Sequence, residues 1–300
     1  MTAVTSVSAS IATIARHGEP LRRFAGPARR VLPPALTVVG FLFGLLMISG
    51  MALRTDAELF HSIGLDRPYT GIVGDDGAFV YSPAFAQALQ PLRVLPVEWF
   101  VTLWRVAELS LLTILAGPWT LLLLLVVPVT AELMEAQVHL FLAAAIVAAW
   151  RWPGLWAIPI LTKPTLGVGL LFHVGARDWR SLRIALAWTA AISLVSLAMV
   201  SALWMEWIKV LAGSASHQLS GPVILIPLVV RLPVAAALAW YAGRRSWPRL
   251  VPIAAMIALP ALWIVGLSMA VAAIPDVRGL RAGRVAERRS EAEPAGASAA

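Results

Sequence analysis

The chain contains no cysteine. This absence excludes disulfide bonds, thiolate metal sites and cysteine nucleophiles. Charged residues are also scarce, at 13% of the 300 residues, whereas hydrophobic residues make up 59%. No soluble domain of this length has such a composition, and the mean hydropathy is +0.80. The sequence therefore predicts a polytopic membrane protein.

The few charged residues are predominantly basic, with a formal net charge of +8 and a pI of about 11.1. Such a balance is typical of nucleic-acid-binding proteins, but no basic stripe here is interleaved with aromatic residues on a soluble fold. In a membrane protein, arginines gather in the cytoplasmic loops and tails. We therefore interpret the charge as a sign of orientation and expect no nucleic-acid partner.

The chain divides into three expected parts. Residues 1–30 form a basic segment that is too long for a secretory n-region, and no small-residue cleavage site follows it. The apolar run 31–53 is therefore expected to be a retained membrane helix that opens a membrane domain of residues 31–275, with residues 1–30 in the cytoplasm. Residues 276–300 form a charged, alanine-rich tail that we expect to be disordered and cytoplasmic. Within an acidic outer loop, 54–95, apolar residues near helical spacing in 82–95 predict a short amphipathic helix on the outer membrane surface.

The arginines test how the later apolar runs cross the membrane. These runs are 97–116, 119–130, 138–150, 153–174, 182–203, 222–241 and 250–274. If each crosses once, the basic loops 177–183 and 244–249 both fall outside, against the positive-inside rule. If 153–174 turns back at Lys163-Pro164 and 250–274 turns back at Pro260-Ala261, every basic loop lies inside.

The arms of these two hairpins are short. With about 10–14 residues each, they reach roughly half-way across a ~30 Å hydrocarbon core, which is tolerated where they line a cavity. We therefore predict an all-α polytopic helical bundle with short broken helices in the cell membrane. Both termini are expected in the cytoplasm, and the loops 54–95 and 205–220 outside.

Lys163 is the most informative single residue, because it lies inside an apolar run with no acidic neighbour in sequence. A charge near the bilayer centre costs ~2.5–3.5 kcal/mol or more, and the proline that follows breaks the helix at that point. A broken membrane helix with a cation at its break predicts part of a site for an anionic ligand. The alternative is a lysine that snorkels to the nearer interface.

Other polar residues gather on the same expected outer side. Asp56 follows the first membrane helix, where apolar surroundings would raise its pKa and suit it to general base catalysis; the alternative is an ordinary solvated loop acid. Tyr69, Phe79, Tyr81 and Pro83 form an aromatic, turn-rich stretch, which is typical of interfacial belts and also of sugar-stacking sites.

Two further clusters lie at outer turns. Glu132, Glu135, Gln137 and His139 occur between two apolar runs; His139 is either a helix-end residue or a ligand, and the spacing suits a metal poorly. The loop that follows residue 203 carries residues that are belt residues by default, Trp204, Trp207, His217 and Gln218.

In this order the residues resemble the polytopic, mannosyltransferase-like glycosyltransferases of family 87, which have the GT-C fold. The resemblance extends from about Val31 to Ile274, and its most specific blocks are Tyr81-Ser82-Pro83 and Leu161-Thr162-Lys163-Pro164. The remaining matching blocks are Asp56 after the first helix, Asp66-Arg67-Pro68-Tyr69, Ala136-Gln137-Val138-His139 and His217-Gln218-Leu219-Ser220-Gly221. Two departures are an alanine, Ala136, where the family has glycine, and a short C-terminal half.

The resemblance implies transfer of a hexose, typically mannose, from a polyprenyl-phosphate donor at the outer face of the membrane, with Asp56 as the base. Such a donor carries its own leaving group, so the reaction needs no metal or other cofactor. It needs a base for the acceptor hydroxyl and a cation for the departing phosphate, for which Lys163 is expected, with Arg67 as helper. A single base acting opposite the leaving group predicts inversion. The other expected donor-binding residues are Tyr81, Gln137, His139 and His217.

Several readings stay open at this point. The acceptor is a lipid, a glycan or a protein. Broken helices and a lysine near the bilayer centre also suit a secondary transporter or lipid flippase, although no internal repeat is visible. A catalytically inactive membrane partner in cell-envelope assembly is the third possibility.

Overall fold

The computed structural model describes residues 19–51, 55–71, 77–214 and 226–275. Over these ranges it contains helices and no strand, which confirms the predicted all-α class. The α-helices are α2 (Glu19–Ser49), α3 (Asp56–Ser62), α4 (Pro83–Leu89), α5 (Val97–Ala116), α6 (Thr120–Leu123), α7 (Val127–Glu135), α8 (His139–Ala148), α9 (Ala157–Thr162), α10 (Leu171–Gly175), α11 (Trp179–Met199), α12 (Ser201–Ser214), α13 (Leu228–Arg245) and α14 (Leu250–Ile257). The 3-10 helices are η1 (Gln90–Val94), η2 (Gly117–Trp119), η3 (Pro153–Trp156), η4 (Pro164–Leu170) and η5 (Ile264–Ala273).

Three helical stretches within the described ranges are long and apolar enough to cross a membrane. They are Leu32–Ser49 within α2, Val97–Leu123 from α5 to α6, and Trp179–Met199, which is α11. The pair α7 and α8 makes a fourth if it is one span, although its axis bends by 107°. The remaining apolar helices are shorter, as expected for broken segments.

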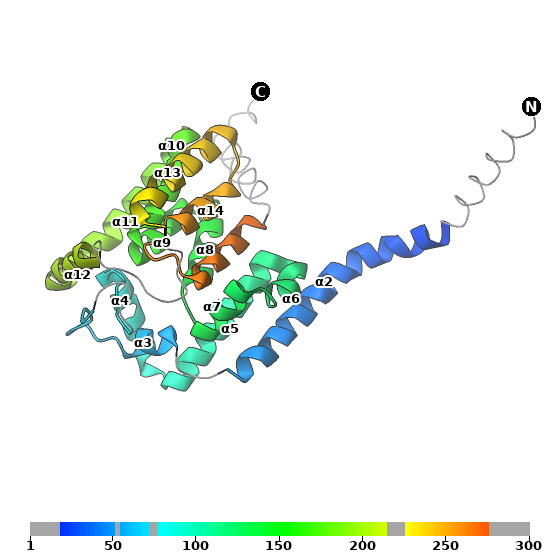
Figure 1. The fold of residues 1–300 in the computed structure, drawn as a ribbon, viewed down its shortest axis with the longest axis horizontal. Coiled ribbons are helices and arrows are strands. Elements are labelled where there is room, and N and C mark those ends of the chain that lie inside the picture. The colour runs from blue at the N-terminus through cyan, green and yellow to red at the C-terminus, as the bar shows by residue number, and fades with distance from the viewer. Residues whose placement is uncertain (1–18, 52–54, 72–76, 215–225, 276–300) are drawn as a thin grey trace, which may run out of the picture.

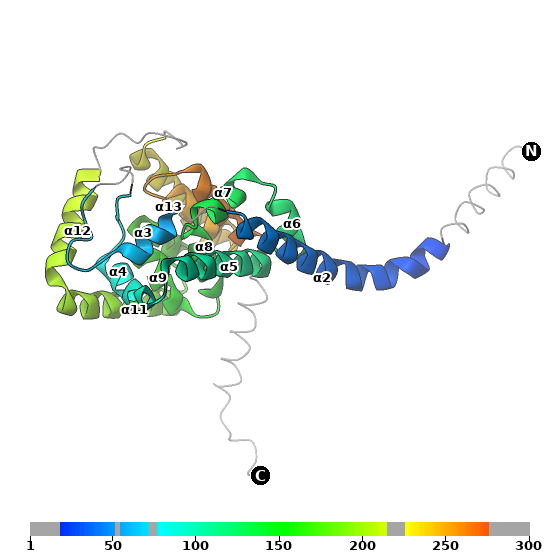
Figure 2. The same cartoon turned by 90° about the horizontal axis from the view of Figure 1, so that it is seen from below.

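Helix α2 begins at Glu19, well before the apolar run that opens at residue 31, so it includes part of the basic segment. Pro20 suits the first turn of a helix because its missing N–H is not needed there. The N-terminal part of α2 projects away from the rest of the molecule, and its C-terminal part lies along α5 and α6 (Figures 1 and 2). Gly40 and Gly44 make this contact possible, because a Cβ at Gly40 would lie 2.8 Å from the Leu121 nitrogen and one at Gly44 would overlap Leu109. Small residues spaced by four are a common way for membrane helices to approach closely.

The predicted hairpin at Lys163-Pro164 is present. Helix α9 ends at Thr162, Lys163 is extended (φ −137°, ψ 98°), and η4 starts at Pro164. The two arms run antiparallel, because a Cβ at Gly167 would lie 3.7 Å from Ile160 and one at Gly169 would touch Trp156. The proline breaks the helix as expected, since it offers no N–H to the preceding turn.

The second predicted hairpin is also present, and a buried arginine supports it. Helix α14 packs beside η5 after a turn through residues 258–263. Arg231 of α13 is 5% exposed and donates to the carbonyls that this break leaves free. The acceptors are the oxygens of Ile257 at 2.6 Å, Leu259 at 2.8 Å and Pro260 at 3.0 Å.

Arg105 of α5 has the corresponding role at the end of α7. Its guanidinium donates to the carbonyl oxygens of Leu133 at 3.1 Å and Met134 at 2.8 Å. Helix ends leave carbonyls without partners, and in an apolar surrounding water cannot satisfy them. The buried arginines Arg105 and Arg231 therefore stabilise two of the helix breaks from neighbouring helices.

The predicted helix in residues 82–95 is present as α4 and η1, but its apolar face packs differently from the expectation. Leu89 is 3% exposed, and the ring of Phe85 lies 5.7 Å from that of Phe60 in α3. These residues pack inside the protein, whereas Leu92 and Val94 are exposed. The prediction that this face lies on the membrane surface is therefore wrong for Phe85 and Leu89, because α3 supplies an apolar partner that the sequence pattern does not show.

Candidate functional site

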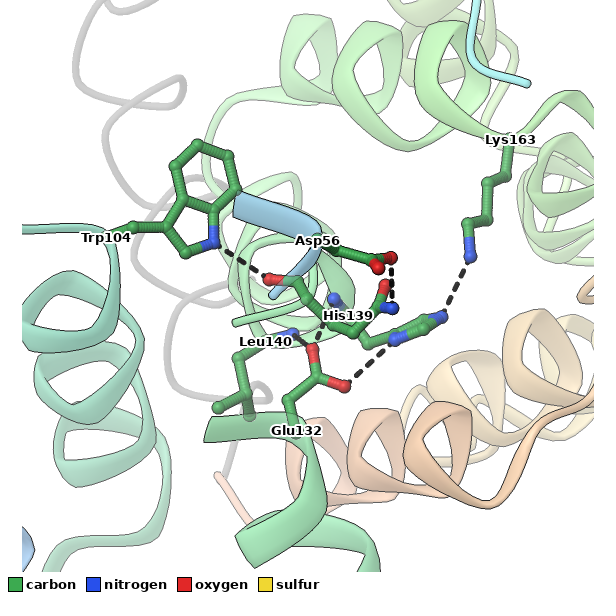
Figure 3. A network of polar contacts seen from close by, with 7 residues as sticks. Asp56, Trp104, Glu132, His139, Leu140 and Lys163 are labelled. Carbon is green, nitrogen blue, oxygen red and sulfur yellow. Dashed lines mark hydrogen bonds and ion pairs between the residues drawn. The ribbon is translucent and has the colours of Figure 1, made fainter. Parts of the chain in front are cut away.

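The sharp turn between α7 and α8 organises the candidate site (Figure 3). Ala136 ends α7 in the left-handed conformation, with φ 47° and ψ 55°. Such a backbone costs an alanine roughly 1–2 kcal/mol relative to an ordinary helix residue. Glycine would adopt this conformation without that cost. The turn at Ala136 directs Gln137 toward α3 and His139 toward Lys163.

Glu132 holds the start of α8 in place. Its Oε1 accepts from the backbone N–H of His139 at 2.6 Å and of Leu140 at 3.2 Å, and its Oε2 lies 2.9 Å from Nδ1 of His139. Both side chains are buried. A carboxylate at a helix N-terminus satisfies free N–H groups and interacts favourably with the helix dipole. Glu132 is thus the N-terminal cap of α8 as well as the partner of His139.

Lys163 completes a chain of three side chains. Its Nζ lies 2.9 Å from Nε2 of His139 and 5.7 Å from the centroid of the Tyr81 ring. An ammonium group only donates, so Nε2 is the accepting nitrogen and Nδ1 carries the proton given to Glu132. The amine therefore turns into the protein, which does not agree with a snorkelling lysine. Lys163 also forms no ion pair with Glu132 or Glu135, since His139 lies between Lys163 and Glu132 (Figure 3).

Asp56 is the first residue of α3, and the turn between α7 and α8 brings Gln137 to it. The Gln137 side-chain amide donates to Oδ2 of Asp56. Oδ1 has no hydrogen-bond partner among the described residues, and the side chain is partly exposed. Trp104 of α5 helps to hold Gln137 in place, because its Nε1 donates to the backbone carbonyl of Gln137 at 3.0 Å.

The surroundings of Asp56 favour the protonated carboxyl. Burial raises its pKa from 3.8 to about 6, and the Lys163 ammonium and the Gln137 hydrogen bond oppose part of this rise. A carboxyl with a pKa near 6 is ionised at neutral pH, yet it is a stronger base than an ordinary aspartate. The predicted rise in pKa is therefore present, and Asp56 is not an ordinary solvated loop acid.

The aromatic stretch forms a packed cluster beside this network. Phe79 is fully buried and Tyr81 is 5% exposed. The Tyr81 ring lies 5.0 Å from Phe85 and 5.4 Å from Phe60, and its backbone carbonyl accepts from the Tyr69 hydroxyl at 2.9 Å. These rings pack against one another inside the protein and do not form an interfacial belt. Tyr81 contributes one face to Lys163, and the cluster fixes where that face lies.

The fold thus brings together the predicted residues Asp56, Gln137, His139, Lys163 and Tyr81. Arg67 is exposed in the loop after α3 and is not part of the network, so its expected role as helper to Lys163 finds no support. His217, together with residues 215–220 of the expected outer loop, lies outside the described residues.

The expected outer loop that starts at residue 205 is helical up to Ser214, because it belongs to α12. Figure 2 shows α12 standing across the end of α11. Trp207 is 7% exposed and its Nε1 donates to the Val80 carbonyl at 3.0 Å. Trp207 is therefore not an interfacial belt residue. Its hydrogen bond connects α12 to the segment that carries Tyr81.

Two features of the site were not predicted from the sequence. They are the contribution of Trp104 and the role of Glu132 as the N-terminal cap of α8. Trp104 looks like any aromatic residue of an apolar helix, and only its distance to the Gln137 carbonyl shows its function. Among the described residues, no group of three His, Cys, Asp or Glu side chains is placed to hold a metal ion. The network instead offers a basic carboxylate and, on its far side, an ammonium group.

This arrangement can remove a proton from a hydroxyl group and stabilise a nearby anion. Comparison with family models, with curated proteins and with solved structures finds no match for this chain. The similarity to glycosyltransferase family 87 therefore rests on the sequence blocks described above.

Proposed function

We propose that the protein is a membrane glycosyltransferase of the GT-C type that moves a hexose, mannose by resemblance, from a polyprenyl-phosphate donor to an acceptor. Asp56 accepts the proton of the acceptor hydroxyl as the new glycosidic bond forms. The bond between the sugar carbon and the phosphate oxygen breaks, and Lys163 stabilises the phosphate that leaves. No metal is required, because the donor brings its own phosphate leaving group.

One observation carries this proposal. Among the described residues, a carboxylate with one unpartnered oxygen and a raised pKa lies in the same polar cluster as a lysine that has no carboxylate partner. Lys163 is hydrogen bonded only to neutral His139 among the described residues, so its charge is available to an anion. The ammonium is also close enough to Asp56 to lower the pKa of that carboxyl. Transfer from a sugar phosphate needs a base for the acceptor hydroxyl and a cation for the departing phosphate.

Replacing the lysine tests the donor site. Lys163→Met is expected to weaken binding of a polyprenyl-phosphate hexose by about tenfold or more, because a charge-assisted phosphate contact is lost. The free energy of unfolding should change by no more than ~1 kcal/mol, since relief of the buried charge offsets the lost hydrogen bond to His139. Affinity and stability are measured on the same purified variant.

Lys209→Met is the matched control, because Lys209 is exposed on α12. Lys209→Met should alter neither the donor affinity nor the free energy of unfolding. Unchanged donor affinity in Lys163→Met would exclude Lys163 from the site, and a loss of stability of ~3–5 kcal/mol would make it a structural charge.

The pH dependence of transfer follows from the pKa of Asp56. The base must be ionised, and its pKa is raised to about 6. The rate should therefore fall about tenfold per pH unit below pH 6 and level off as the pH approaches 7. A pH–rate profile at saturating donor checks this. A fall only near pH 4 would mean that the base is an ordinary, solvated carboxyl.

From the arginine distribution we propose that Asp56 and Lys163 lie toward the outer face of the cell membrane and that both termini are cytoplasmic. Native cysteine is absent, so single-cysteine labelling is clean. A Trp179→Cys variant, altered at the exposed first residue of α11, is expected to resist a membrane-impermeant maleimide in intact cells and to react after permeabilisation. Labelling in intact cells would contradict the hairpin topology.

A secondary transporter is the second candidate, and the buried chain Glu132, His139 and Lys163 favours it. Ionisable groups hydrogen bonded in series between broken helices are typical of proton-coupled carriers. The two functions differ in covalent outcome: a transporter or flippase moves its substrate intact, whereas a transferase breaks the bond between sugar and phosphate. An inactive partner in cell-envelope assembly would bind donor without either result.

A further inference from the structure

A second charged region lies at the end of the molecule opposite α3, where α10 meets α13 (Figure 1). The two helices touch through glycines. A Cβ at Gly175 would overlap the Trp240 carbonyl oxygen and lie 3.2 Å from the Arg244 nitrogen, and one at Gly243 would lie 2.9 Å from the Ala176 nitrogen. This backbone contact sets the loop after α10 directly against the last turn of α13.

Both segments carry exposed arginines. Arg177, Arg180 and Arg183 come from the loop after α10 and the start of α11, and Arg244 and Arg245 from the end of α13. Arg177 follows Ala176, and Arg244 follows Gly243, so the contact between Ala176 and Gly243 brings the backbones of these two exposed arginines close to each other. Arg177 also has the left-handed conformation, with φ 55°, which a non-glycine residue adopts at a cost.

The nearby acid does not neutralise these arginines. Asp178 is the only acidic residue in segments 176–183 and 243–249. Its Oδ1 accepts from the backbone N–H of Ser181 at 3.2 Å, which caps α11, and its Oδ2 lies 3.4 Å from Nδ1 of buried His173. Asp178 therefore fixes the loop, and the guanidinium groups of its neighbours remain directed to the surface.

Aromatic side chains flank the arginines. The Arg244 guanidinium lies 5.9 Å from the Trp240 ring and that of Arg245 5.4 Å from the Tyr241 ring. Trp179 and Trp247 are about half exposed, at 52% and 45%. Exposed tryptophan beside arginine is typical of the depth of lipid headgroups, and it distinguishes this patch from a basic surface in open water.

We propose that these two segments form a binding site for an anionic phospholipid headgroup. The phosphodiester lies between Arg177 and Arg244, whose planar guanidinium groups each offer paired donors to phosphate oxygens. The acyl chains follow the apolar flank of α13. Basic regions between membrane helices are suited to anionic headgroups. This site is separate from the Asp56 region and does not depend on the proposed transfer reaction.

Lipid-dependent thermal stability of the full chain in a neutral detergent tests the site. Phosphatidylglycerol should raise the Tm of the wild type, since a ligand that binds only the folded state stabilises it. Phosphatidylcholine and inorganic phosphate at equal concentration should not, because the first lacks net charge and the second lacks acyl chains. The double variant Arg177→Gln with Arg244→Gln should bind phosphatidylglycerol about 10- to 30-fold more weakly.

Arg93→Gln is the matched control, because Arg93 is exposed on η1 and distant from both segments. It should respond to the lipid as the wild type does. If the double variant does not fold, Arg180→Gln and a salt titration of the wild type replace it, with binding weaker at 300 mM than at 50 mM NaCl. Equal stabilisation of the double variant, equal stabilisation by phosphatidylcholine, or tighter binding of a short DNA duplex at the same arginines would overturn the proposal.

Discussion

Asp56→Asn is expected to reduce sugar transfer by about 10²–10⁴-fold, the range usually lost with a general base. The amide keeps the size of the side chain but cannot accept the proton of the acceptor hydroxyl. Donor binding should stay within about threefold of the wild type, because the phosphate contact belongs to Lys163. Initial rates of transfer and donor affinity on the purified variant measure the two effects separately.

Asp66→Asn is the control for this result, since Asp66 is an exposed carboxylate in the same loop region. It should transfer sugar at the rate of the wild type. Near-normal transfer by Asp56→Asn would assign the base to another residue, and a matching loss in Asp66→Asn would mean that loop charge in general is responsible.

Glu132→Ala is expected to lower the free energy of unfolding by ~3–5 kcal/mol, because it removes a buried carboxylate that satisfies several hydrogen-bond donors. The change strands three donors at once: the backbone N–H groups of His139 and Leu140, and Nδ1 of His139. Each stranded group costs ~1–3 kcal/mol. Reversible unfolding in mixed detergent measures the effect.

Glu135→Ala separates this role from a general effect of removing an acid near the turn. Glu135 lies in the same helix but is exposed, so the variant should stay within ~0.5 kcal/mol of the wild type. Equal losses in the two variants would show that Glu132 does not cap α8 in solution.

The hairpin at Lys163 was predictable because two independent features agreed on it. A proline after the lysine breaks a helix locally, and the arginines of the flanking loops require an even number of crossings. Both features are present in the sequence itself. The contacts of Ile160 with Gly167 and of Trp156 with Gly169 confirm that the arms return on each other.

The membership of the candidate site was predictable only in part. Asp56, Gln137, His139 and Lys163 were named from the blocks of the sequence, and the structure brings them together. Arg67 was named on the same grounds but points to solvent. Sequence order shows which residues lie near one end of a helix, whereas the direction of a side chain depends on packing far along the chain.

The roles of Arg105, Arg231 and Glu132 could not be predicted, because most of their partners are backbone groups. Arg231 binds carbonyls 26 to 29 residues away, and Arg105 binds carbonyls 28 and 29 residues away. The sequence does not show which backbone carbonyls lack a hydrogen-bond partner. A buried arginine in an apolar helix therefore indicates that a helix break needs donors, but it does not identify the break. The strained Ala136 is similar, since alanine is usually a helix residue.

The most direct test of the account follows the sugar itself. Purified wild-type protein in proteoliposomes is given a polyprenyl-phosphate donor labelled in the hexose, together with membrane lipid, glycan and peptide acceptors. A glycosyltransferase separates the label from polyprenyl phosphate and links it covalently to one acceptor, and Asp56→Asn does not. If the label stays on intact donor in the presence of correctly folded wild-type protein, the proposed function is contradicted. This holds whichever leaflet the donor occupies.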